Sequence, residues 1–196
     1  MDLVEIPDEI IQENTRTFIE LLKSTKRPGI EKLIAQLLKT DFFRAPASTK
    51  YHMCCEGGLC QHSLNVYRLL KSKVYSGLIE LPEESVIITA LCHDICKADF
   101  YTIETRWKKN KLGKWESYTA YGIDDKLPLG HGEKSCYILQ QYITLSPLEY
   151  AMIRFHMGRE QGTMQDGFGN AANHWPQVAA IHTADLEASF IVEARE

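Results

Sequence analysis

Apolar residues recur three or four positions apart through most of this 196-residue chain, and this spacing limits the fold more than any other feature. A period near 3.6 places these side chains along one face of a helix, where they can pack against other helices. Proline, glycine and acidic residues mark several of the expected helix starts and ends. The sequence therefore predicts an all-α bundle. The expected helices cover residues 8–24, 30–38, 62–74, 82–96, 131–139, 146–155 and 176–191.

One segment departs from the helical pattern. Residues 100–105 and 115–121 are rich in Tyr, Thr and Ile, and they flank the polar stretch 109–114. This arrangement is typical of a β-hairpin with a polar turn. Residues 158–175, which are rich in Gly and Asn, are expected to form a loop.

The composition is that of one ordinary globular domain, with 44% hydrophobic and 24% charged residues. A net charge of −4 argues against a general nucleic-acid-binding surface. No apolar run reaches transmembrane length and the acidic N-terminus lacks signal-peptide features, so we expect a cytoplasmic protein without membrane attachment. The six cysteines are expected to be reduced and mostly buried. We expect one domain over residues 1–196, with N-terminal helices in 1–43, a core in 44–190 and the hairpin inserted at 100–122.

An adjacent His93-Asp94 pair ends an apolar helix that runs from Val86 to Leu91. Neighbouring residues of a helix diverge by about 100°, so both side chains can reach one metal only if it lies beyond the helix end. An imidazole nitrogen together with a carboxylate oxygen suits divalent Mn, Fe, Co, Ni or Zn. The pair is therefore a candidate metal-binding site.

Two further motifs could complete this site. A pair of glycines follows His52 and permits a close backbone approach just before the helix that carries His62. His182 and Asp185 are three residues apart, so their side chains share one helical face. An unpaired carboxylate inside the apolar helix of Asp185 would be costly, and either a metal or a basic neighbour would account for it.

The order His62, then His93-Asp94, then Asp185 resembles the H…HD…D signature of the HD-domain metal-dependent phosphohydrolases. The resemblance covers residues 44–190. It implies the helical bundle of that family with a β-hairpin insertion, and a catalytic metal held by these four residues.

The closest likeness lies in two short motifs. A Gly-Gly-Leu-x-x-His run ends at His62, and residues 93–97 match the family's HDxGK motif, with Cys96 in place of the glycine and Lys97 retained. Both motifs are similar to HD domains of the bacterial 3′–5′ exoribonuclease type and to small uncharacterised HD hydrolases.

Members of this family that bind two metals carry two more histidines between the HD pair and the last Asp. His131 and His156 match those positions, although Met157 follows His156 where many relatives have a second His. The resemblance therefore implies one or two divalent transition metals (Mn, Fe, Ni, Co or Zn), the second on His131, His156 and a bridging Asp94.

The resemblance implies hydrolysis of a phosphate mono- or diester, an EC 3.1 activity, by attack of a metal-activated hydroxide. The implied substrate is a nucleotide or a small phosphorylated metabolite. Three alternatives stay open: 3′–5′ cleavage of nucleic acid, a non-catalytic module that senses a nucleotide, and the oxygenase chemistry of distant HD relatives with two irons. The oligomeric state is also open, a homo-oligomer included.

Lys97 and His52 are candidates, with Asp94, for a part in the chemistry. Lys97 lies one helical turn past His93, so it could bind a phosphate oxygen or cap the helix C-terminus. His52 could contact the substrate, give a proton to the leaving oxygen, or anchor its loop.

Glu133 and His182 are expected to support the metal ligands from behind. An acidic residue at a helix N-terminus is the alternative reading of Glu133. The candidates for contact with the substrate are Lys97, His52, Arg159 and Trp175.

The hairpin interleaves basic and aromatic residues, which could bind a nucleotide or a single strand by charge and stacking. The favoured alternative is a solvated tip with its tryptophans packed on the body of the protein. Because the hairpin falls between the HD pair and His131, it is also expected to form a wall or lid over the cleft, which would favour a small enclosed substrate. The residues concerned are Arg106, Trp107, Lys108, Lys109, Lys111, Lys114 and Trp115.

Overall fold

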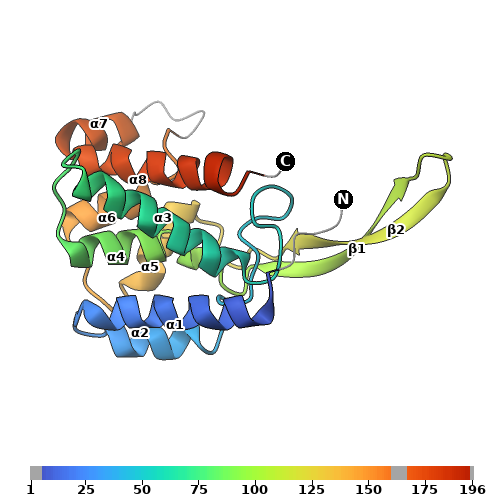
Figure 1. Cartoon of the computed structure of the whole chain (residues 1–196), viewed down its shortest axis with the longest axis horizontal. Helices are drawn as coiled ribbons and strands as arrows, with labels where there is room; N and C mark the ends of the chain where they lie inside the picture. The colour runs from blue at the N-terminus through green and yellow to red at the C-terminus, as the bar shows by residue number, and fades with distance from the viewer. Residues whose placement is uncertain (1–5, 160–166, 195–196) are drawn as a thin grey trace.

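The structure, a computed structural model, describes residues 6–159 and 167–194. Figure 1 shows a helical body from which a two-stranded hairpin projects. The helical body confirms the all-α prediction, and the hairpin lies in the one segment for which the sequence predicts strands. Within the described ranges, no helix combines the length and the apolarity that a membrane crossing requires.

The helices of the body pack around one core. In Figure 1, α1 and α2 lie along one side and α7 and α8 along the opposite side, with α3 to α6 between them. α3 packs against α1, α4 and α8. The helices are α1 (Asp8–Ser24), α2 (Ile30–Leu37), α3 (Gly58–Tyr75), α4 (Glu83–Cys92), α5 (His131–Leu139), α6 (Pro147–Arg154), α7 (Gly167–His174) and α8 (Pro176–Glu187), with a 3-10 turn η1 (Ile95–Lys97) and a π-helical segment η2 (Ala188–Val192).

α4 is the central helix of the body. Every residue from Ser85 to Cys92 is buried, because the helix is apolar on all sides and other helices cover it. Leu64 of α3 and Ile181 of α8 belong to the same cluster of buried side chains. The residues that follow α4 are therefore delivered into the interior of the protein and not to its surface.

A buried ion pair joins the N-terminal helices to α6. Ser146 and Glu149 form a capping box at the start of α6. The Glu149 carboxylate also accepts two hydrogen bonds from the Arg27 guanidinium, at 2.7 and 2.8 Å, and one from the Ser85 hydroxyl at 2.8 Å. This carboxylate thus connects the α1–α2 turn, α4 and α6.

Several predicted boundaries need correction. α3 begins at Gly58, one turn before His62, and α4 ends at Cys92, after which the chain tightens into η1. Residues 167–174, expected as part of a loop, form α7 because they pack against α8, which outweighs their weak helix propensity. Residues 160–166 of that expected loop lie outside the described residues.

The hairpin consists of β1 (Tyr101–Lys109) and β2 (Trp115–Ile123), paired antiparallel in continuous register. It projects away from the helical body in Figure 1. The expectation of a lid over the cleft is therefore wrong for this structure. The expected packing of the tryptophans on the body is also wrong, because Trp107 and Trp115 are exposed.

All six cysteines are buried reduced thiols, as the sequence predicted. Burial raises the pKa of Cys60, Cys92, Cys96 and Cys136 to about 12. These thiols are therefore protonated at neutral pH and behave as small apolar side chains in the core.

Candidate metal centre

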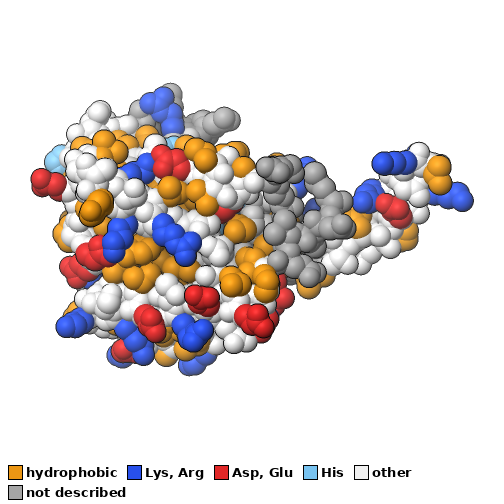
Figure 2. Space-filling view, viewed as in Figure 1, with side chains coloured by type: hydrophobic (Ala, Val, Ile, Leu, Met, Phe, Trp, Pro, Cys, Tyr) orange, Lys and Arg blue, Asp and Glu red, His pale blue; other side chains and the backbone are white. Residues whose placement is uncertain are grey.

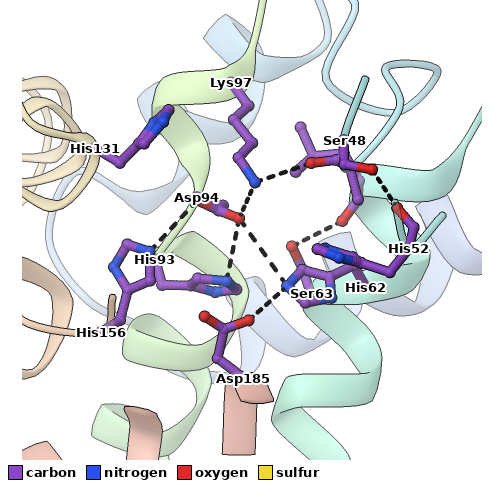
Figure 3. Close-up of polar contacts among 12 residues, drawn as sticks. Ser48, His52, His62, Ser63, His93, Asp94, Lys97, His131, His156 and Asp185 are labelled. Carbon is purple, nitrogen blue, oxygen red and sulfur yellow. Dashed lines mark hydrogen bonds and ion pairs between the residues drawn. The ribbon is translucent and has the colours of Figure 1, made fainter. Parts of the chain in front are cut away.

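Four elements bring the predicted ligands together in the middle of the body (Figure 3). His62 comes from α3, His93 caps the C-terminus of α4 and Asp94 follows it, and Asp185 comes from the last turn of α8. His156 follows α6. Except for Asp185, which is partly exposed, these side chains are buried.

Asp94 lies at the centre of this cluster. Its Oδ2 is 3.4 Å from His93 Nε2 and 4.0 Å from His62 Nε2, and its Oδ1 is 3.5 Å from His156 Nε2. His62 Nε2 also lies 3.1 Å from Asp185 Oδ1. Donor atoms that bind one ion at about 2.1 Å are themselves about 3 Å apart, so these separations suit ligands of a common cation.

Backbone carbonyls fix the orientation of two imidazoles. His93 Nδ1 lies 2.8 Å from the Ala90 carbonyl oxygen and His156 Nδ1 lies 2.7 Å from that of Ile153. Since a carbonyl only accepts, each Nδ1 carries the proton and donates it. The lone pair is then on Nε2, the atom that faces Asp94, and this is the tautomer that a metal-binding His needs.

Five polar atoms of the cluster are buried and make no hydrogen bond of good geometry in the described ranges, although His62 Nε2 lies 3.1 Å from Asp185 Oδ1. Buried polar groups are otherwise almost always satisfied. Six buried side-chain atoms of the described residues are unsatisfied, and five of them belong to this cluster, a pattern consistent with a site that could hold a metal ion. The five are His52 Nε2, His62 Nε2, His93 Nε2, His156 Nε2 and Asp94 Oδ1.

Among the described residues, three groups of side chains could each hold a metal ion, with the ligand atoms of a group within 4.8 Å of one another. Two of these groups consist of predicted ligands alone. The first is His62, His93 and Asp185, and the second is His93, Asp94 and His156. His131 belongs to neither. Its Nδ1 lies 3.5 Å from Cys96 Sγ, and its ring contacts Phe100.

The third group consists of His52, His62 and Glu193, and Glu193 is a residue that sequence reasoning missed. Both carboxylate oxygens of Glu193 lie 3.1 Å from His62 Nδ1, and Asn65 donates to Oε1 at 2.9 Å. A carboxylate behind a ligating imidazole fixes its tautomer and raises its basicity. Glu193 is thus placed to support His62 from the side opposite Asp185.

A π-helical segment delivers Glu193 to this position. η2 continues α8 with a wider turn, and the Glu193 N–H donates to the Ala188 carbonyl at 2.9 Å, which closes the turn. The wider turn is a tertiary feature with no simple sequence pattern, and such segments occur often at functional sites. One signal was available in the sequence: a single acidic residue after a run of apolar ones, eight positions beyond Asp185.

The charges of the cluster favour a divalent cation. Asp94, Asp185 and Glu193 are opposed by the single ammonium group of Lys97, which leaves two negative charges uncompensated among these four side chains. Burial lowers the pKa of His62, but Asp185 and Glu193 outweigh burial and raise that pKa to about 10. The field that holds a proton on His62 would equally favour a metal cation at its Nε2.

Lys97 is held against the cluster and does not cap α4. Its ammonium lies 2.7 Å from Asp94 Oδ2 and donates to the Ala47 carbonyl at 2.9 Å. Burial lowers the pKa of Lys97, but the charge of Asp94 outweighs burial and the pKa is raised. For Asp94 burial acts in the opposite direction and raises the pKa. The charges of Lys97 and His93 and the hydrogen bond with His156 outweigh burial and hold the pKa of Asp94 well below its usual value. Both groups are therefore charged at neutral pH.

His52 lies beside His62 at the edge of the cluster. The two ring centroids are 4.9 Å apart, and burial, followed by repulsion from His62, lowers the pKa of His52 to about 4. A cavity of about 260 Å³ opens next to it. The cavity is lined by Lys50, Tyr51, His52, Ser189, Phe190, Glu193 and Ala194.

The two residues expected behind the ligands differ in their placement. His182 Nδ1 lies 2.7 Å from the carbonyl oxygen of His156, so His182 supports the backbone that carries a predicted ligand. The Glu133 carboxylate lies 2.7 Å from Arg154 Nη2, in the first turn of α5, which agrees with the alternative reading of this residue.

Of the two further substrate contacts expected, Trp175 can be placed relative to Asp185. Trp175 is the N-cap of α8, at the opposite end from Asp185, and ten residues of helix separate them by about 15 Å. Arg159 is exposed, next to residues outside the described ranges. Contact of Arg159 or Trp175 with a substrate therefore stays a prediction.

Glycines allow the close approach that positions His62. Gly57 has a φ of +76°, a conformation that suits glycine, and turns the chain into α3. A Cβ on Gly58 would lie 2.2 Å from the Met53 carbonyl oxygen, so the loop that carries His52 can pack on the start of α3 only where a side chain is missing. This agrees with the role predicted for the glycine pair.

Comparisons with known proteins give one curated relative. No family model matches the sequence, and no solved structure matches it. The chain is 28% identical over 131 residues to the dihydroneopterin 2′,3′-cyclic phosphate phosphodiesterase of Methanocaldococcus jannaschii. The match covers 62% of this chain and 47% of the relative, so the chain spans about half the length of that protein. A distant relative is thus a phosphodiesterase that acts on a small phosphorylated molecule.

Proposed function

We propose that the chain is an HD-type metal-dependent phosphohydrolase that cleaves a small phosphodiester, a nucleotide or a similar phosphorylated metabolite. One observation carries the proposal: four imidazole Nε2 atoms and one Asp94 oxygen converge, buried, without hydrogen-bond partners among the described residues. The distant phosphodiesterase relative supports the reaction class, and its name favours a cyclic phosphate among the substrates to be tried.

The proposed ligands of the first metal are His62, His93, Asp94 and Asp185. A divalent cation held there would supply a nucleophile at neutral pH and take up negative charge that develops on the phosphoryl oxygens. A second site at Asp94 and His156, with His131, stays a prediction, and for it the His131 ring would have to turn away from Cys96.

The residues around the ligands have separate proposed tasks. Lys97 has three ammonium protons, and its contacts to Asp94 and Ala47 use two, which leaves one donor for a phosphoryl oxygen of the substrate. Glu193 and the carbonyls of Ala90 and Ile153 hold the imidazoles in the tautomer that presents Nε2. The cavity beside His52 is the proposed place for the organic part of the substrate.

The test is hydrolysis of bis(p-nitrophenyl) phosphate and of 2′,3′-cyclic nucleotides with Mn²⁺, Co²⁺, Ni²⁺ or Zn²⁺. Metal content is measured on the same preparations by elemental analysis. We expect Asp94→Asn to lower kcat/KM by about 10³-fold and to reduce the bound metal, because the variant lacks the central carboxylate charge.

The matched control is Asp124→Asn, the same change at an exposed Asp whose carboxylate lies 3.5 Å from the Lys126 ammonium. It should leave metal content and kcat/KM within twofold of the parent protein. Full activity of the Asp94 variant, or tight metal binding unaffected by it, would contradict the assignment of the centre.

A further inference from the structure

The hairpin has one apolar face and one charged face. Directly opposed residues of an antiparallel pair share a face, so the register assigns each side chain. Trp107 pairs with Ser117 and Trp115 with Lys109, which puts both tryptophans on one face. The same face carries Tyr101, Ile103, Thr105, Lys109, Ser117, Thr119, Tyr121 and Ile123, so most but not all of its side chains are apolar or aromatic. The opposite face carries Thr102, Glu104, Arg106, Lys108, Glu116, Tyr118, Ala120 and Gly122.

The apolar face of the hairpin is open to solvent. The exposed fractions are 76% for Ile103, 63% for Trp107, 64% for Trp115 and 57% for Ile123. Alternation of this kind is typical of strands that bury one face, and a lone two-stranded hairpin is only marginally stable in water. The hairpin therefore has the pattern of a sheet whose apolar face is covered, while its own body does not cover it (Figure 1).

The charge of the hairpin is opposite to that of the rest of the chain. Residues 101–123 contain five basic and two acidic side chains, a net charge of +3, and the remaining residues contain 17 basic and 24 acidic ones, a net charge of −7. Figure 2 shows basic side chains at the far end of the hairpin. An acidic copy of the same chain is a complementary surface for this end.

The two faces also argue against a nucleic acid as the partner. Binding of a single strand by stacking needs cations beside the aromatic rings, to meet the phosphates. On the tryptophan face the cation is Lys109, whose ammonium lies 5.4 Å from the centre of the Trp115 ring. Arg106 and Lys108 lie on the opposite face, where they pair with Glu104 at 3.1 Å and Glu116 at 3.6 Å, so one strand cation of the three is placed to meet phosphates beside the rings. The face with the tryptophans is thus suited to an apolar protein surface.

We propose that the apolar face of the hairpin is a dimerisation surface that packs against the hairpin of a second copy of this chain. The two copies are related by a two-fold axis, so each hairpin covers the tryptophans of the other. The basic end of each hairpin extends toward the acidic body of its partner.

The area available reaches the lower bound expected of a specific interface. Aromatic side chains bury about 150–250 Å² each, so two partly exposed tryptophans and two isoleucines remove roughly 500 Å² per copy from water. Both copies together then bury on the order of 1,000 Å², the lower bound for a specific interface. Contacts between the hairpin ends and the bodies add to this area.

The test is sedimentation velocity of the full chain from 1 to 100 µM. The parent protein should sediment as a dimer in the upper part of this range. The double variant Trp107→Ser/Trp115→Ser should raise the dissociation constant at least about 50-fold. The matched control Lys108→Ser/Tyr118→Ser, two changes to serine on the charged face, should change it by less than about threefold.

A monomeric parent protein at 100 µM would overturn the proposal, and so would an unchanged dimer of the tryptophan variant. Binding of a labelled 20-nucleotide single strand is measured with the same proteins as a further test. Binding of this strand by a monomeric parent, lost in the tryptophan variant, would show that the face takes nucleic acid and would also overturn the proposal.

A second measurement does not depend on whether the double variant keeps its hairpin. Trp175→Phe removes the third tryptophan of the chain, so the remaining emission reports Trp107 and Trp115. Dilution from 100 to 1 µM should then increase acrylamide quenching and shift the emission to the red. Quenching that is high and independent of concentration would contradict burial of these side chains in a dimer.

Discussion

The centre of the helical body and the hairpin depart from the usual rule of burial in opposite directions. In the body, four histidines and three carboxylates meet in an interior where polar groups are rare. In the hairpin, two tryptophans and two isoleucines stand in solvent. Each departure is informative because it carries a cost, of unsatisfied polar atoms in one region and of exposed apolar surface in the other.

The difference lies in how many neighbours hold each region in place. The site residues are fixed by helices that pack on several sides and by backbone carbonyls that orient the rings. The hairpin is held by its own strand pairing and by few contacts at its base, such as the bond from the Tyr101 hydroxyl to the Ala47 carbonyl at 3.0 Å. We therefore expect the same type of substitution to change the free energy of unfolding strongly in the body and weakly in the hairpin.

The largest expected difference concerns ion pairs. Glu149→Ala should lower the free energy of unfolding by about 3–5 kcal/mol, because it leaves the half-buried Arg27 without its bidentate partner. Glu116→Ala in the hairpin breaks an exposed pair with Lys108 and should cost less than about 1 kcal/mol. Urea denaturation of both variants measures the two values, and equal values would remove the contrast between the regions.

The same carboxylate predicts a dependence on pH. Burial raises the pKa of Glu149, but hydrogen bonds from Arg27, Ser146 and Ser85 outweigh burial and hold the pKa below its usual value. The unfolded state then binds the proton more readily, so this contribution to stability is present above about pH 4.3 and is lost as the pH falls through the folded pKa. Glu149→Gln should make the loss of stability in acid less steep.

The second prediction compares the same apolar change in both regions. Ile88→Ala, in the buried part of α4, should destabilise the protein by about 2–5 kcal/mol through lost burial and a cavity. Ile103→Ala in the hairpin should change the free energy of unfolding by less than about 0.5 kcal/mol at concentrations where the chain is monomeric. A large cost at Ile103 under these conditions would mean that the body already covers the hairpin.

The third prediction has the smallest expected effect. It compares how much two acidic residues of the body, Glu193 and Glu133, contribute to metal affinity. Glu193→Gln should weaken metal binding about 10–100-fold, because the amide supports the imidazole of His62 less well than the carboxylate. Glu133→Gln, which alters a pair with Arg154, should leave metal affinity within about twofold. Isothermal titration of the apoprotein with Mn²⁺ measures both, and the reverse order would restore the original expectation for Glu133.

Much of the site could be predicted from local sequence. Short motifs point to His62, His93, Asp94 and Asp185, and the family resemblance adds His156; the structure gathers these five into adjoining groups of ligand atoms. Helix ends explain part of this success, because His93 and His156 follow α4 and α6 and donate Nδ1 to carbonyls of the turn before them. These contacts are only three residues apart, so a local pattern contains them.

Other residues depended on contacts that no local pattern contains. Glu193 reaches His62 across 131 positions of the chain, through a π-helical segment that the apolar spacing of α8 does not reveal. Trp175 was expected near the substrate from its place in a loop, but its distance from Asp185 along α8 is set by the length of the helix. The placement of His131 likewise depends on how α5 meets η1.

The sequence alone determined the helical body, the hairpin and the identity of most candidate ligands, because each depends on residue period or on short motifs. The tertiary structure decided which Nε2 atoms converge, which carboxylate supports His62, and that the hairpin points away from the site and not over it. These outcomes follow from packing between distant segments, where the direction of each side chain depends on all the helices that surround it.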